Sequence, residues 1–119
     1  MLKILFLFFI TFPALACSGF LVEGKLSVDG QNWKFNRKFK LGQEEMVPAG
    51  PYIVSMTFTY PENGYRAKYK IEEKKGTSLV LITRGEEDDL VTGKSRDIFA
   101  RGETGQPNSI ITVQLKEIP

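Results

Sequence analysis

The sequence contains no histidine and only one cysteine among its 119 residues. Histidine is the commonest general base and metal ligand in proteins, and the Ser-His-Asp arrangement depends on it. The lone Cys17 has no partner for an intramolecular disulfide, and it leaves neither a Cys-His pair nor a thiolate metal site. These absences argue against an enzyme. We expect no catalytic residue, no metal and no cofactor.

Patterns with the period of a helix are also missing after the first seventeen residues, as is a Gly-rich nucleotide-binding loop. The formal net charge is only +2, which favours neither an acidic nor a basic partner. A single-strand nucleic-acid surface interleaves exposed aromatic side chains with cations. Here the aromatic residues alternate to the face opposite the cations, so we expect no nucleic-acid partner.

One long apolar run is present, Ile4–Phe12, and it follows the positive charge of Lys3. Its length is about half of the ~20 residues that a membrane-spanning helix needs. Pro13 ends the run, and Ala14 and Ala16 provide the small residues that a signal peptidase recognises. We therefore expect an export signal over residues 1–16, removed from a single all-β domain over residues 17–119.

The four residues Ala14-Leu15-Ala16-Cys17 resemble the end of a bacterial lipoprotein signal, in which the cysteine becomes the lipid-bearing first residue. A general signal peptidase would also cut after Ala16, leaving Cys17 as a free thiol. The sequence thus leaves two alternatives for an exported, periplasmic or secreted protein. It is either soluble or anchored to the outer membrane through a lipid on Cys17, and that lipid would be its only link to a membrane.

Alternating apolar and polar residues predict a β-hairpin over Phe20–Leu41, with a two-residue turn at Asp29-Gly30. In that register Gly24 leaves room for the ring of Phe35. Arg37 falls on the apolar face, which indicates a sheet-edge position or a carboxylate partner. The predicted cross-strand pairs are Val28 with Gln31, Leu26 with Trp33, Gly24 with Phe35, Val22 with Arg37 and Phe20 with Phe39.

The remainder of the chain predicts further short strands separated by turns. We expect residues 42–51 to form a connection, Leu79–Ile82 to lie in a central strand covered on both faces, and Gly85–Asp89 to form an acidic loop. The fold class is all-β, a single small antiparallel β-sandwich or partly closed barrel of about seven or eight strands. The other expected strands are Tyr52–Tyr60, Tyr65–Glu72, Ser78–Thr83, Leu90–Thr92, Ile98–Arg101 and Ile110–Leu115.

Two groups of side chains are candidates for a functional surface. Six cations would form one patch for an anionic surface if their two strands are neighbours, although a solvated outer face with lysines guarding the strand edges is the simpler explanation. The acids Glu86, Glu87, Asp88 and Asp89 match no EF-hand spacing, so a solvated loop is expected there. The six cations are Lys34, Lys38, Lys40, Arg66, Lys68 and Lys70.

The aromatic residues separate two hypotheses of function. The first is an exported, non-catalytic domain of the bacterial cell envelope that acts by protein–protein or surface contact with an unidentified partner. The alternative is a barrel that binds a small ligand or lipid in a cavity above ~300 Å³. In the first case the aromatic residues form a filled core anchored by a buried Trp33, and in the second they line a cavity. The aromatic residues concerned are Trp33, Tyr52, Phe58, Tyr60 and Tyr69.

Overall fold

The computed structural model describes residues 19–61 and 63–117, and this part of the chain contains eight strands and no helix. It accordingly offers no helical segment with the length and apolarity needed to span a bilayer. The strands are β1 (Phe20–Val28), β2 (Gln31–Phe39), β3 (Glu45–Ala49), β4 (Tyr52–Thr59), β5 (Tyr65–Lys75), β6 (Ser78–Leu90), β7 (Ser95–Ala100) and β8 (Ser109–Glu117).

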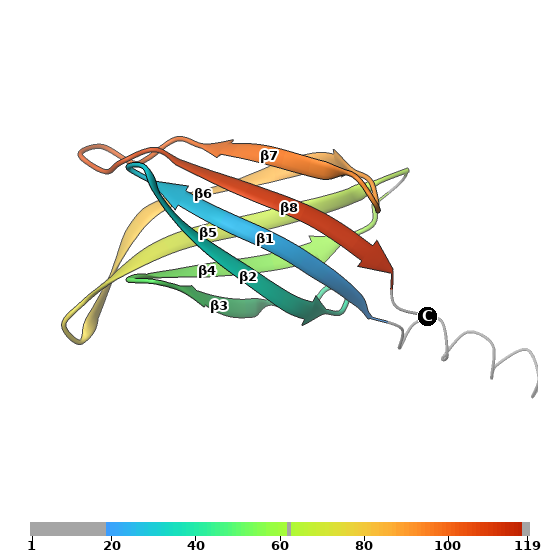
Figure 1. Ribbon diagram of the computed structural model, residues 1–119, viewed down its shortest axis with the longest axis horizontal. Coiled ribbons are helices and arrows are strands. Elements are labelled where there is room, and N and C mark those ends of the chain that lie inside the picture. The colour runs from blue at the N-terminus through green and yellow to red at the C-terminus, as the bar shows by residue number, and fades with distance from the viewer. Residues whose placement is uncertain (1–18, 62, 118–119) are drawn as a thin grey trace, which may run out of the picture.

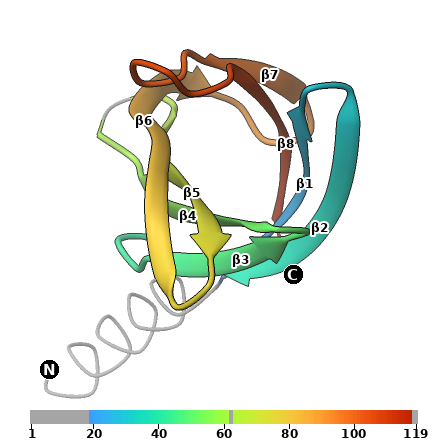
Figure 2. The same cartoon turned by 90° about the vertical axis from the view of Figure 1, so that its left-hand side faces the viewer.

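These strands make two four-stranded antiparallel sheets (Figure 1). The first sheet has the order β2-β1-β8-β7, and the second sheet has the order β3-β4-β5-β6. Figure 2 looks along the strands and shows the two sheets on opposite sides of a common interior. The predicted fold class is therefore confirmed as an antiparallel β-sandwich.

The first hairpin has the register that the sequence predicted. Val28 pairs with Gln31 and Gly24 with Phe35, and no residue is skipped between β1 and β2. Asp29 and Gly30 both have positive φ, 50° and 80°, as a type I′ turn requires. A Cβ atom added at Gly24 would lie 2.2 Å from Phe35 Cζ, so the ring fills the space that glycine leaves.

Inward-facing side chains from both sheets fill the interior. Phe39 and Phe58 are 1% and 0% exposed, and their ring centroids lie 5.0 Å apart at an interplanar angle of 81°. Phe20 packs edge-on against Phe58 at 5.3 Å. Such edge-to-face contacts add to the gain from burying the rings. Other fully buried members of the core include Val22, Leu26, Val54, Met56, Ile71, Ile82, Leu90, Ile98, Ile111 and Leu115.

Trp33 does not anchor the core as predicted. It is only partly buried, and it packs against Tyr52 at the edge of the core, with ring centroids 5.4 Å apart. The reason is its place early in β2, an edge strand of the first sheet, where one flank of the ring stays open. Tyr60 is also outside the core, at 52% exposure. The remaining aromatic candidates, Tyr52, Phe58 and Tyr69, are buried core residues.

Two further expectations are wrong. The expected connection over residues 42–51 contains a strand, β3, which pairs with β4 despite Pro48. The apolar run Leu79–Ile82 does not lie in a central strand, because β6 is an edge strand of the second sheet. Leu79 is 45% exposed, and only Ile82 of this run is fully buried.

Candidate functional site

The six predicted cations come from strands that are not neighbours. Lys34 and Lys38 lie on β2 in the first sheet, and Lys40 follows that strand directly. Arg66, Lys68 and Lys70 lie on β5 inside the second sheet. The single patch required these two strands to be adjacent, so the six cations form two separate groups.

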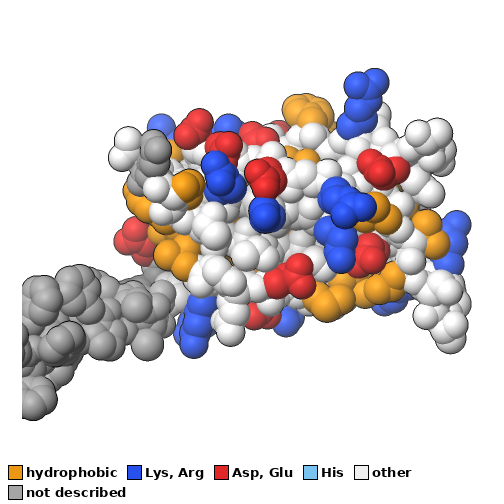
Figure 3. Space-filling view, turned by 180° about the vertical axis from the view of Figure 1, so that it is seen from behind, with side chains coloured by type: hydrophobic (Ala, Val, Ile, Leu, Met, Phe, Trp, Pro, Cys, Tyr) orange, Lys and Arg blue, Asp and Glu red, His pale blue; other side chains and the backbone are white. Residues whose placement is uncertain are grey.

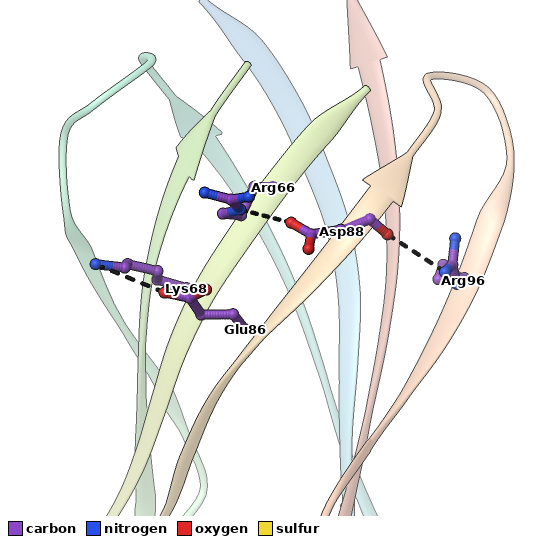
Figure 4. Close-up of polar contacts among 5 residues, drawn as sticks. All are labelled: Arg66, Lys68, Glu86, Asp88 and Arg96. Atoms are coloured by element: carbon purple, nitrogen blue, oxygen red, sulfur yellow. Dashed lines mark hydrogen bonds and ion pairs between the residues drawn. The ribbon is translucent and has the colours of Figure 1, made fainter. Parts of the chain in front are cut away.

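The cations of β5 are matched by acids of the second sheet. Arg66 Nε lies 2.5 Å from Asp88 Oδ1, and Lys68 Nζ lies 3.7 Å from Glu86 Oε1 (Figure 4). Lys70 Nζ is 3.7 Å from Glu72 Oε1. Figure 3 shows this outer face with blue and red side chains interspersed. Exposed pairs of this kind add little stability, but they leave no block of positive charge on the face.

The four consecutive acids lie within β6 and not in the expected loop. Because strand residues alternate in direction, Glu86 and Asp88 reach the cations of β5, while Glu87 turns toward Arg96 of β7. The carboxylates therefore diverge. No group of three potential metal ligands occurs within residues 19–61 and 63–117.

Arg96 connects the two sheets along one edge of the sandwich. Its guanidinium lies 3.0 Å from Glu87 Oε2 and donates to the backbone oxygens of Asp88 and Asp89 at 3.3 and 3.1 Å. Figure 4 shows it reaching from β7 to the strand that carries Asp88. Arg96 was not singled out from the sequence, and no pattern in β7 marks it.

Arg37 has the corresponding place at the opposite edge. It lies on β2, the edge strand of the first sheet, and its Nη2 donates to Glu45 Oε1 of β3 at 3.2 Å. Both expectations for this residue, an edge position and a carboxylate partner, are confirmed. Arg37 and Arg96 therefore act as structural links between sheets and are not candidates for a ligand site.

The lysines of the first sheet have a different environment. Lys34 lies directly opposite Lys25 in the β1–β2 ladder, and like charges in that position repel each other. Within the described part of the chain, no ion pair involves Lys25, Lys34, Lys38 or Lys40. We call these four residues the lysine strip. Lys25 was not among the predicted site residues, although the predicted hairpin register already placed it beside Lys34.

Phe99 is the most exposed large apolar side chain that the structure describes, at 78%. It lines an open groove of about 710 Å³ together with Arg101, Ile110 and the turn residue Asp29. The sequence predicted a strand here but did not indicate whether Phe99 points toward the core or toward solvent. The reason is that Ile98-Phe99-Ala100 is apolar at three consecutive positions and the alternation is lost.

Three tyrosine side chains have a raised pKa. Burial raises the pKa of Tyr52, Tyr65 and Tyr69 above the ordinary value of 10.0, and nearby carboxylates add to the effect. A tyrosine of ordinary pKa is already neutral at pH 7, and the raised pKa of these three hydroxyls extends their neutral form to higher pH. A raised pKa is the opposite of what a tyrosinate nucleophile or base requires.

Cys17, the predicted lipidation site, lies outside the described residues. Comparison with protein-family models, with curated proteins and with solved structures finds no match for this chain.

Proposed function

We propose that this protein is an exported, non-catalytic β-domain of the bacterial cell envelope, and that it acts by contact through its outer surface. The observation that supports the proposal is the filled interior. The rings of Phe39 and Phe58 meet between the sheets, and both rings and the Met56 side chain are each at most 1% exposed. The groove beside Phe99, by contrast, opens outward. Such a molecule offers a partner its faces and leaves little room inside for a ligand.

The alternative, a barrel that binds a small ligand or lipid internally, has less support. A pocket for a drug-sized ligand needs roughly 300–1,000 Å³ and buries most of the ligand. The rings of Phe20, Phe39 and Phe58 pack against one another, with centroids 5.0 to 6.3 Å apart, and occupy space between the sheets that an internal ligand would need. Binding at that place would require the core to open.

The two functions predict different results from one experiment. A photoreactive amino acid is placed at Phe99 on the first sheet and, in a second variant, at Arg84 on the second sheet. We expect irradiation of cells to join at least one of these exposed positions to a protein or lipid of the envelope. We also expect the purified protein to show no stoichiometric small molecule in native mass spectrometry. A tightly held small molecule together with no adduct at either position would favour the internal-ligand alternative.

Export is proposed from the segment before the sandwich. We predict that the exported protein begins at Cys17, because Ala14 and Ala16 form the cleavage site. The intact mass decides this and also distinguishes a free thiol from a lipid-bearing cysteine. An exported product that retains residues 1–16 would contradict the prediction.

A further inference from the structure

No carboxylate in the part of the chain that the structure describes forms an ion pair with the lysine strip. Its members run along the outer side of β1 and β2, with Lys25 and Lys34 directly opposed. On the second sheet, in contrast, Arg66 and Lys68 of β5 each have a carboxylate from β6. Keeping like charges side by side costs free energy unless an anion binds there.

The acids that share the outer face of the first sheet are already engaged elsewhere. Glu23 of β1 forms an ion pair with Lys116 of β8. Asp97 of β7 accepts a hydrogen bond of 2.8 Å from Thr112 Oγ1. Neither side chain makes an ion pair with the lysine strip, so the face presents uncompensated positive charge along its β2 side.

Phe99 lies on the same outer face, across the sheet from the strip. The ladders place Asn32 opposite Ser27, Ser27 opposite Ile110, and Ile110 opposite Phe99. This row crosses all four strands and ends in a phenyl ring that is 78% exposed. A single four-stranded face thus combines a cationic side with an apolar side chain that stands out into solvent.

We propose that the outer face of the first sheet binds an anionic phospholipid bilayer. The ammonium groups of the lysine strip contact the headgroup phosphates, and Phe99 enters the boundary between headgroups and acyl chains. This proposal rests on the proposed function, since it names the surface that the exported domain contacts. Cys17 precedes β1 by only three residues, which reach at most about 11 Å. A lipid on that cysteine would therefore hold this sheet near the membrane.

A bilayer fits these side chains better than a polyanionic chain does. A nucleic-acid strand is held by cations interleaved with several aromatic stacking platforms. Here the aromatic ring and the cations lie toward opposite edges of the sheet, because Phe99 is on β7 and Lys34 on β2. A bilayer surface is extended and planar, so it can contact the lysine strip and Phe99 at the same time.

The test measures partition of the chain from Cys17 onward onto phospholipid vesicles by co-sedimentation. This chain contains both sheets in full, and a Cys17→Ser change excludes lipid and intermolecular disulfide effects. We expect binding to vesicles with about one third phosphatidylglycerol and little binding to pure phosphatidylcholine. Raising the salt to ~0.5 M should release the protein, because exposed charges are then screened.

The decisive comparison uses two double variants with the same change in net charge. Lys25→Gln with Lys34→Gln should weaken partition about 25-fold, since each lysine near an anionic surface contributes a factor of about five. Lys68→Gln with Lys70→Gln removes two cations from the second sheet and should change it less than about twofold. Phe99→Ser should weaken partition roughly tenfold, because its ring loses the gain from burial. All three changes concern exposed or partly exposed side chains, and thermal unfolding checks that the fold is kept.

Several results would overturn the inference. Equal losses from the two lysine pairs would mean that net charge alone drives binding. Equal partition onto neutral and anionic vesicles, or no partition at all, would show that the lysine strip does not bind anionic phospholipid. Retention by inorganic polyphosphate without vesicle binding would assign the strip to a polyanion. An envelope protein joined at Phe99 in cells, with no vesicle binding, would reject the bilayer while leaving the proposed contact function intact.

Discussion

Replacing Phe58 by alanine is expected to lower the free energy of unfolding by about 3–5 kcal/mol. The side chain is 0% exposed, and it holds Phe20 and Phe39 in edge-to-face contact from the opposite sheet. Its removal leaves a void that the two sheets cannot close, since each is fixed by its own hydrogen-bonded ladders. A loss of this size is a large part of the 5–15 kcal/mol that typically stabilises a domain. Urea unfolding measures it as a lower midpoint with an unchanged slope.

Phe99→Ala is the matched control for that experiment. The same atoms are removed from a strand residue, but the ring is 78% exposed. We expect a change within about 0.5 kcal/mol, as for other surface substitutions. Similar losses at the two positions would mean that Phe99 packs against the sandwich and that neither the core nor the exposed face is as described.

The first hairpin could be predicted because local chemistry alone determines it. Asp29-Gly30 fixes a two-residue turn, and a shift of one residue would move Lys34 and Lys38 onto the core side. The side-chain pattern and the turn therefore favour the same register. The unusual position of Arg37 was also informative. A cation on the apolar face of a strand is stable only at a sheet edge or beside a carboxylate, and Arg37 has both.

The second sheet was harder to predict because its strands depend on partners far away in the sequence. Pro48 suggested a connection, yet proline is tolerated in an edge strand, where its missing N–H need not pair. The run Leu79–Ile82 suggested a covered strand, but the pairing of β5 with β6 shifts between Ile71 and Glu72 and changes which residues face inward. No local sequence pattern predicts this shift in the strand register.

The candidate surface was predicted in part. Alternation correctly assigned Lys34 and Lys68 to outer faces, because strand phase is a local property. The sequence could not predict which cations form ion pairs. Lys68, for example, lies beside Glu86 only because the β5–β6 register places these two residues opposite each other. The difference between a paired and an unpaired lysine, on which the bilayer proposal depends, is therefore a property of the fold and not of the sequence pattern.

Gly50→Ala is expected to cost about 3 kcal/mol, from two effects that add. Gly50 has φ of 61°, and an L-residue pays about 1–2 kcal/mol in that region. The new Cβ would also lie 2.2 Å from Trp33 Nε1, so the indole must leave its contact with Tyr52. Overpacking of this kind costs a further 1–3 kcal/mol or so. A shift in tryptophan emission should accompany the loss, because Trp33 is the only tryptophan.

Gly76→Ala separates the two effects. Gly76 has nearly the same φ, 64°, but a Cβ there meets no atom within 4 Å, so only the backbone cost of about 1–2 kcal/mol remains. In a Trp33→Leu background, where the indole is absent, Gly50→Ala should cost no more than Gly76→Ala. The coupling between positions 33 and 50 in this double-mutant cycle then measures the steric part directly. If Gly50→Ala costs the same with and without the indole, Trp33 does not lie over Gly50 and the packing described for this end of the core is wrong.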